Sequence, residues 1–335
     1  MKSMTGRRSR RNGLRNLDPV KTAIAWASLI LLCSGSASRS TAGSWTATPP
    51  MATARAAHAV VVADGAVYVL AGTGADGRPV LDVERFDGRT WAHETALPGH
   101  GLNAPAAAAI GHRIYLIGGF DTTTNVPTAQ VLVYDTTTHR WSDAAPLPRP
   151  RGGHAVAVLD GRIHVIGGGN SESTIPDHWV YDPATDRWSS LAPLPRAMGS
   201  PAAVVHAGSL YSIGGRSGLE DFGDVWRYDS SADRWLPGPA IPARGTHGAI
   251  SACGSIYVFG GESQPQARVL ADVLRLDSST NSWVALAPLP TPRNFARAVL
   301  FQGAAWVVGG SLEPGSSHSS AGSRTVERFD PGCRP

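Results

Sequence analysis

After residue 42 the chain contains no lysine, so every cationic side chain from there to residue 335 is an arginine. The whole chain carries 30 Lys and Arg against 26 Asp and Glu. Residues 1–42 hold eight of the basic and one of the acidic residues, which leaves 22 against 25 and a net charge of about −3 in residues 43–335. Because this part has no basic surplus, we expect no nucleic-acid partner.

Cysteine is also scarce, with Cys33, Cys253 and Cys333 as its three occurrences. Their spacing matches no metal-ligand pattern, and we expect neither a metal nor another cofactor. Cys253 and Cys333 would be able to pair in an oxidising compartment. The first is expected beside an inner strand and the second beside an outer one, which argues against pairing on distance. The sequence leaves the pairing open.

Residues 1–42 have the layout of a secretory signal peptide: a basic stretch, then the apolar run Ala23–Leu32, then small residues. The apolar run is too short to span a bilayer comfortably, and cleavage after Ala37 or Ala42 fits. We therefore expect export to the periplasm, cell envelope or medium of a bacterium, with membrane contact only through an uncleaved leader. Residues 9–15 resemble a twin-arginine signal, and Sec export, twin-arginine export and a lipid on Cys33 stay open.

Three features repeat in register along the rest of the chain, which indicates a repeat architecture. Six tryptophans lie 46 to 50 residues apart: Trp45, Trp91, Trp141, Trp188, Trp235 and Trp283. Glycine pairs precede them, with a degenerate first copy at Ala71-Gly72: Gly118-Gly119, Gly167-Gly168, Gly214-Gly215, Gly260-Gly261 and Gly309-Gly310. An aromatic or leucine residue followed by Asp recurs as well: Phe86-Asp87, Tyr134-Asp135, Tyr181-Asp182, Tyr228-Asp229, Leu276-Asp277 and Phe329-Asp330.

Each unit is predicted to form four short strands. In the third copy they cover residues 154–160, 162–168, 179–182 and 187–194. Short β-branched and aromatic runs separated by Gly, Pro and Asp favour an antiparallel meander. A four-stranded sheet with two apolar faces needs a neighbour on each side, and radial stacking into a propeller provides one.

Over residues 45–332 these features resemble the kelch repeat, whose period is about 50 residues. The sixth copy, residues 293–330, lacks a fourth strand, whereas residues 45–51 are a fourth strand with nothing before them. We therefore expect an all-β, six-bladed kelch-type β-propeller over residues 43–335. Its ring is closed by the N-terminal strand, which completes the last blade.

Candidate ligand-binding residues recur where the innermost strand of each blade begins. Copies one, three and five carry Arg-x-x-His and copy six carries the arginine alone: Arg55 with His58, Arg151 with His154, Arg244 with His247, and Arg293. At the mouth of the central channel they would form a funnel of guanidinium groups for an acidic ligand. Arg216, directly after a glycine pair, is expected on the same face. The alternative is that these residues only order the entry into each blade, as they do in kelch sequences generally.

Other kinds of site fit less well. Three histidines are a zinc ligand set, but His58, His154 and His247 lie on alternate blades and would have to converge on one ion. Neither a Gly-x-Ser-x-Gly elbow nor paired glycosidase carboxylates recur. The copper radical oxidases share the kelch propeller, but their extra domain has no counterpart here.

The resemblance implies two classes of function, and whether the chain is an enzyme is left open. The first is a secreted binding module for an acidic peptide, protein loop or acidic glycan at the channel-mouth face. The alternative is a sugar-acid mutarotase of the N-acetylneuraminate epimerase type, which needs only a general acid and base around the sugar ring. Those enzymes have longer insertions between strands than this chain. A third possibility is an inert scaffold whose arginines are purely structural.

Overall fold

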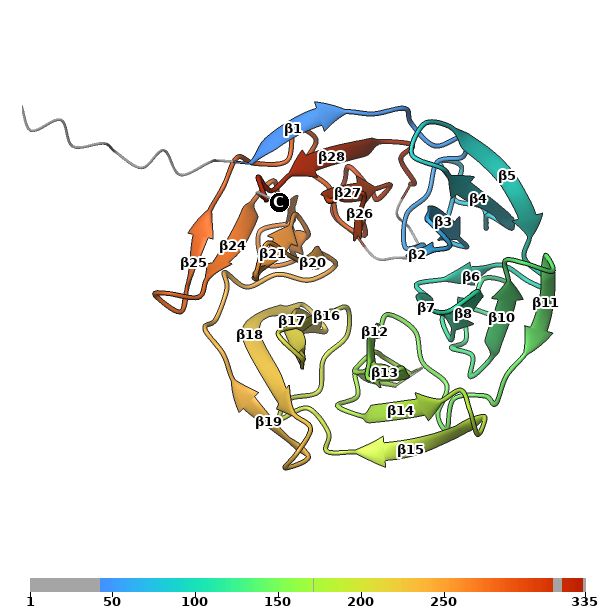
Figure 1. Cartoon of the computed structure of the whole chain (residues 1–335), viewed down its shortest axis with the longest axis horizontal. Coiled ribbons are helices and arrows are strands. Elements are labelled where there is room, and N and C mark those ends of the chain that lie inside the picture. The colour runs from blue at the N-terminus through green and yellow to red at the C-terminus, as the bar shows by residue number, and fades with distance from the viewer. Residues whose placement is uncertain (1–42, 171, 316–320, 334–335) are drawn as a thin grey trace, which may run out of the picture. The chain divides into compact units, whose positions relative to one another are not determined.

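The computed structural model describes residues 43–170, 172–315 and 321–333. The predicted signal peptide, including Cys33, lies outside these residues. Six four-stranded antiparallel sheets are arranged as blades around a central channel (Figure 1). The all-β, six-bladed prediction is confirmed. In the described part of the chain, no helix is long and apolar enough to cross a bilayer.

Each blade runs from an inner strand at the channel to an outer strand at the rim. Blade one consists of β2 (Ala59–Ala63), β3 (Ala66–Leu70), β4 (Asp82–Phe86) and β5 (Trp91–Ala96). Blade two consists of β7 (Ala106–Ile110), β8 (Arg113–Ile117), β10 (Val131–Asp135) and β11 (Arg140–Asp143). Blade three consists of β12 (Ala155–Leu159), β13 (Arg162–Ile166), β14 (His178–Asp182) and β15 (Arg187–Leu191). Blade four consists of β16 (Ala202–His206), β17 (Ser209–Ser217), β18 (Glu220–Asp229) and β19 (Arg234–Pro237). Blade five consists of β20 (Gly248–Ala252), β21 (Ser255–Phe259), β24 (Val273–Asp277) and β25 (Ser282–Ala285). Blade six consists of β26 (Arg297–Phe301), β27 (Ala304–Val308), β28 (Val326–Asp330) and the N-terminal strand β1 (Ser44–Ala47).

The segment that leads from one blade into the inner strand of the next lies beside the connection between the second and third strands of that next blade. Both segments lie on the same face of the ring, which we call the loop face. Backbone bridges pair the two segments in every blade, as between Gly199 and Arg216 or Asn294 and Ser311. Two short sheets also lie on this face. β6 (Leu102–Asn103) pairs with β9 (Phe120–Asp121) between the two segments of blade two, and β22 (Glu262–Ser263) pairs with β23 (Arg268–Val269) within the connection of blade five. The loop face therefore has a backbone framework of its own around the channel mouth.

In blades three and four, the tryptophan of the outer strand and the aspartate two residues before it hold the preceding blade. The indole Nε1–H of Trp188 donates to the carbonyl of Ala145 at 2.8 Å, and Asp186 accepts the N–H of the same residue at 2.8 Å. Trp235 and Asp233 grip Ala192 in the same way one blade later. These contacts satisfy backbone groups that no sheet ladder reaches.

The ring is closed as the sequence predicts. Strand β1 pairs with β28, with Trp45 opposite Phe329 (Figure 1). The Trp45 ring lies 4.9 Å from that of Phe329 and 6.0 Å from that of Phe259 in blade five, and its Nε1–H donates to Ala287 at 3.0 Å. The N-terminal strand thus supplies the outer strand of the last blade and its contact with the blade before.

A disulfide joins Cys253 and Cys333, with their Cα atoms 5.2 Å apart. Cys253 lies in the hairpin turn between β20 and β21, and Cys333 follows β28 of the next blade. The sequence argument against pairing is wrong because the chain turns at Gly332, whose N–H donates to Asp330, and so brings Cys333 back toward that hairpin. The bond ties blade five to blade six beside the place where the ring closes.

Removing this disulfide is expected to destabilise the propeller without changing its fold. The bond links residues 80 apart in sequence, and a loop of that length constrains the unfolded chain by about 4 kcal/mol. Cys253→Ser should therefore lower the urea midpoint markedly. The oxidised wild type should fall to the same midpoint on reduction, whereas the variant should not respond to reductant. An unchanged midpoint in the variant would contradict the stabilising role.

Candidate functional site

The four predicted site arginines begin the inner strands as expected, but they are fully buried, with Arg55, Arg151, Arg244 and Arg293 each 0% exposed. Each guanidinium turns into its own blade and meets a carboxylate of the third strand or just before it. The ion pairs are Arg55–Glu84 at 3.0 Å, Arg151–Asp177 at 3.0 Å, Arg244–Asp272 at 3.1 Å and Arg293–Glu327 at 3.0 Å. A buried charge is stable only when it is paired in this way. The predicted funnel of exposed guanidinium groups is therefore wrong.

These arginines also bind the backbone of the glycine pair. Arg151 donates from Nη1 to the carbonyl of Gly167 at 3.1 Å, and Arg244 donates to that of Gly260 at 3.2 Å. Both glycines have φ near 60°, a conformation that takes their carbonyls out of the sheet ladder. The arginines therefore order the entry into each blade, which is the alternative that the sequence left open.

The three predicted histidines are buried between blades. A Cβ at Gly118 would lie 3.0 Å from the Cε1 of His154, and one at Gly168 would lie 2.9 Å from its Cβ. His58 and His247 make the equivalent contacts, so the glycine pairs provide the space that these rings occupy. Burial lowers the pKa of His154 and His247 to about 3, and that of His58 well below its ordinary value, so all three are neutral at pH 7.

The histidines occupy three separate interfaces and do not converge. Their rings contact the first glycine of the preceding blade's pair, which is Gly118 for His154, Gly214 for His247 and Gly309 for His58. Over residues 43–170, 172–315 and 321–333, no three His, Cys, Asp or Glu side chains are grouped so as to hold a metal ion.

Arg216 lies on the loop face, where its backbone pairs with Gly199, and two carboxylates balance its charge. Its Nη1 pairs with buried Glu262, and its Nε lies 3.6 Å from Asp221. Glu262 also accepts hydrogen bonds from Asn294 at 2.6 Å and from the N–H of Gly315 at 3.0 Å. Only 12% of the Arg216 side chain is exposed, because it lies flat against Gly245.

The mouth itself is narrowed by a collar of residues in left-handed conformation, each placed one residue before the inner-strand histidine or its equivalent: Ala57, Ala104, Gly153, Ser200, Thr246 and Phe295. Backbone hydrogen bonds run from blade to blade around it, as from Gly153 to Ala104 at 2.9 Å and from Ser200 to Gly153 at 2.6 Å. Phe295, 5% exposed, packs there with Ala57 and Ala104. The channel entrance is therefore partly apolar rather than a cationic ring.

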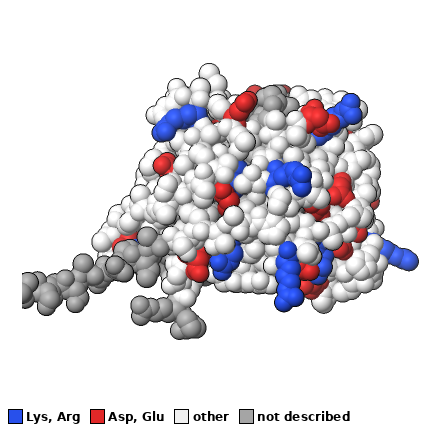
Figure 2. All heavy atoms as spheres, turned by 90° about the horizontal axis from the view of Figure 1, so that it is seen from above, with Lys and Arg blue, Asp and Glu red and all other residues white. Residues whose placement is uncertain are grey.

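Apolar side chains are exposed further out on the loop face. Of the six large apolar residues exposed in the described ranges, four lie on connections between second and third strands: Leu81, Val126, Leu219 and Leu312. Sequence reasoning missed them, although each is an aliphatic residue within a polar loop. On the side of the ring seen in Figure 2, charges of both signs are interspersed without a single-sign patch.

A groove of about 300 Å³ lies on this face between blades two and three. Its lining combines Val126, Pro127 and Pro150 with Arg149, Asn170 and Glu172. Arg149 is half exposed and lies 3.3 Å from Asp177, the carboxylate that also pairs with buried Arg151. Arg149 and Arg151 share the Asp177 carboxylate here, and Glu172 adds a second carboxylate to the lining beside the apolar surface.

Comparison with known proteins agrees with this geometry. Kelch-like protein 35 of Mus musculus is 30% identical over 137 residues, 39% of this chain and 22% of its own length. Alpha-scruin of Limulus polyphemus is 34% identical over 129 residues, 37% of this chain and 14% of its own. The matches thus span less than a quarter of these relatives. The solved structure of YjhT superposes with a TM-score of 0.71 at 16% identity, covering 85% of this chain and 96% of that one, which shows the shared fold.

A family model described as the Attractin/LZTR1 beta-propeller matches residues 114–334. With the repeat, the six blades and the kelch-like relatives in agreement, the chain belongs to this family of kelch-repeat β-propellers.

Proposed function

We propose that this chain is an exported binding module that recognises a protein partner through its loop face. The observation that carries the proposal is that four of the six large exposed apolar side chains in the described ranges lie on strand connections of that face. Loops held by a rigid scaffold are where binding residues concentrate. The Cys253–Cys333 disulfide supports export, because such bonds persist in oxidising compartments.

The groove between blades two and three is the proposed docking site. Val126, Pro127 and Pro150 offer an apolar surface. Arg149 offers a half-exposed guanidinium whose carboxylate partner, Asp177, is shared with Arg151. A partner that places an aliphatic or aromatic side chain next to an Asp or Glu fits both. The proposed ligand is therefore an acidic peptide or protein loop, in preference to an acidic glycan, which would use the charge alone.

A sugar-acid mutarotase at the channel mouth finds less support. Such an enzyme needs a carboxylate or imidazole free to exchange a proton with the sugar. Glu262, at the mouth, already accepts hydrogen bonds from four donors through its two oxygens. His154 and His247 turn into the interfaces between blades. Anomer exchange of sialic acid, followed by NMR, is therefore included as a test of this alternative.

The test is selection of a random peptide library on the immobilised propeller. Enriched peptides are expected to combine an apolar and an acidic residue, and Arg149→Glu with Val126→Asp should weaken their binding at least tenfold. Arg162→Glu is the matched control, because Arg162 is also half exposed and paired with an aspartate, Asp182, but projects from β13. Enriched peptides that bind the double variant and the wild type equally would overturn the groove, and catalysed anomer exchange would favour the enzyme.

A further inference from the structure

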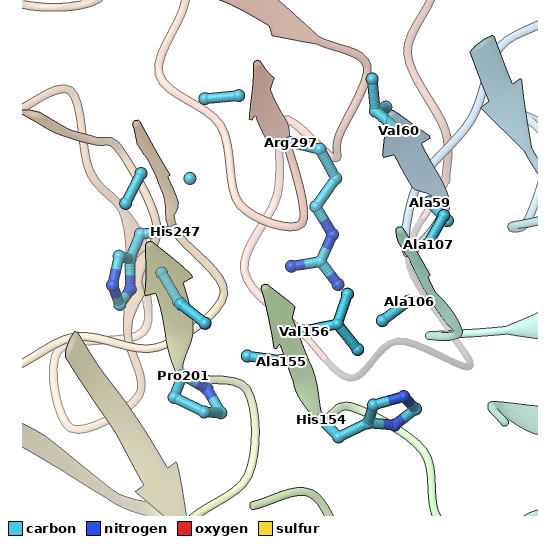
Figure 3. Close-up of a pocket in the computed structure, with 15 residues that line it drawn as sticks. Ala59, Val60, Ala106, Ala107, His154, Ala155, Val156, Pro201, His247 and Arg297 are labelled. Atoms are coloured by element: carbon cyan, nitrogen blue, oxygen red, sulfur yellow. The ribbon is translucent and has the colours of Figure 1, made fainter. Parts of the chain in front are cut away.

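One arginine stands apart from the pattern of the repeat. The first residue of the inner strand is small in five blades: Ala59, Ala106, Ala155, Ala202 and Gly248. In the sixth blade the same place, two residues after the left-handed collar residue, is Arg297. A side chain of this length has no room within the blade interface that an alanine fills. It extends instead into the central channel, as Figure 3 shows.

The Arg297 guanidinium is held at one edge and open at the other. Its Nε donates to the carbonyl of His58 at 3.2 Å, which fixes the direction of the group. Among the described residues, neither Nη1 nor Nη2 has an acceptor or a carboxylate partner. Burial alone lowers the pKa of Arg297 to about 10, so it stays charged at pH 7. The buried arginines discussed above are paired with carboxylates, whereas Arg297, which is only partly buried, is not.

The surroundings give this charge no compensation. The cavity around it has a volume of about 110 Å³ and is lined by alanines, valines, Gly248, Pro201, His154 and His247, with no acidic residue. Arg297 is close enough to contribute to lowering the pKa of His58, His154 and His247, all three of which are neutral. The channel thus holds one positive charge with no acidic side chain among its lining residues.

We propose that the central channel binds one small planar monovalent anion, of the formate, nitrate or bicarbonate class, end-on to Nη1 and Nη2 of Arg297. The planar guanidinium fork matches two oxygens of such an anion and forms two parallel charge-assisted hydrogen bonds. The cavity of about 110 Å³ provides room for an anion of this size. This site is separate from the groove between blades two and three, and either can fail without the other.

The experiment uses formate as the probe and thermal unfolding of the folded protein as the readout. The melting temperature of the wild type should rise by about 3 °C for each tenfold increase in sodium formate above its Kd. Sodium gluconate at equal ionic strength is too large for the cavity and should give a smaller shift. Arg297→Ala restores the residue that four other blades carry and should respond equally to both salts.

Line broadening of ¹³C-formate by NMR gives a readout that does not depend on stability. The wild type and Arg140→Ala, which removes an exposed arginine on β11, should both broaden the signal. Arg297→Ala should not, and Arg297→Lys should broaden it less, because an ammonium lacks the planar fork. Equal broadening by wild type and Arg297→Ala, or equal shifts in melting temperature, would overturn the proposal.

Discussion

Removing β1 by starting the chain at Thr48 is expected to abolish the cooperative unfolding transition of the propeller. The change deletes all four residue pairs between β1 and β28 and the ring contacts of Trp45 with Phe259 and Phe329. Losing a tryptophan at such a contact costs about 3–5 kcal/mol, and the edge of β28 becomes an unpaired template for aggregation. Together these losses approach the whole stability of a typical domain.

Near-UV circular dichroism during heating measures the loss, and size-exclusion chromatography measures association. Trp188→Ala is the matched control, since it removes the same indole contact from a blade that the ring does not depend on for closure. A synthetic peptide of residues 43–50 should restore the transition of the truncated chain by adding the missing strand. If the truncated chain melts like Trp188→Ala, closing the ring contributes nothing beyond one indole contact.

The closure was predictable because it depends on features that repeat. Trp45 has the spacing of the other outer-strand tryptophans, and the sixth copy lacks one, so counting alone places β1 in the last blade. The same counting placed the Arg-x-x-His residues correctly at the start of the inner strands. Counting does not show where their side chains point, and that orientation decides whether the arginines form a ligand site or internal ion pairs.

A comparison of the repeat copies shows which sequence feature indicates that the arginines are paired with carboxylates. Asp177 and Asp272 stand directly before the third strand of blades three and five, which have the arginine, whereas blade two has Leu102 in its place and Gln130 before its third strand. Each blade with the arginine therefore also has a carboxylate at or next to this place, although blade four has Asp224 there with Met198 in the position of the arginine. Periodic features reveal the scaffold, but it is the departures from them, such as Arg297 among alanines, that point to a site.

A second departure from the repeat leads to a prediction about pH. The third residue of the second strand is aromatic in five blades: Tyr68, Tyr115, Tyr211, Tyr257 and Trp306. Blade three has His164 there, and opposite the end of that strand it has His178, where the other blades have valine. The two rings are joined by a hydrogen bond of 2.9 Å between Nδ1 of His164 and Nε2 of His178, packed against Tyr228 and Trp235. Burial lowers the pKa of His164 to about 4 and that of His178 to about 3.

With His58, His154 and His247, five buried histidines are neutral in the folded protein. The unfolded chain binds protons at these residues below about pH 6.5, whereas the folded protein does so only near pH 3 to 4. Between these values the unfolded state holds more protons, so the free energy of unfolding falls as the pH falls. Each histidine contributes about 1.4 kcal/mol per pH unit. We expect the urea midpoint to decrease steeply from pH 6.5, with unfolding without urea before pH 4.

Replacing the pair by the residues of the other blades isolates its contribution. His164→Tyr with His178→Val should remove two of the five proton-binding differences and reduce the slope of the unfolding free energy against pH by about two fifths. His100→Gln removes an exposed histidine and should leave the slope unchanged. A slope that is the same in the double variant would mean that the pair is already protonated in the folded state. Since both rings are enclosed by apolar and aromatic neighbours of the next blade, that outcome would require blade four to open at mild pH, and the near-UV signal of Trp235 would report it.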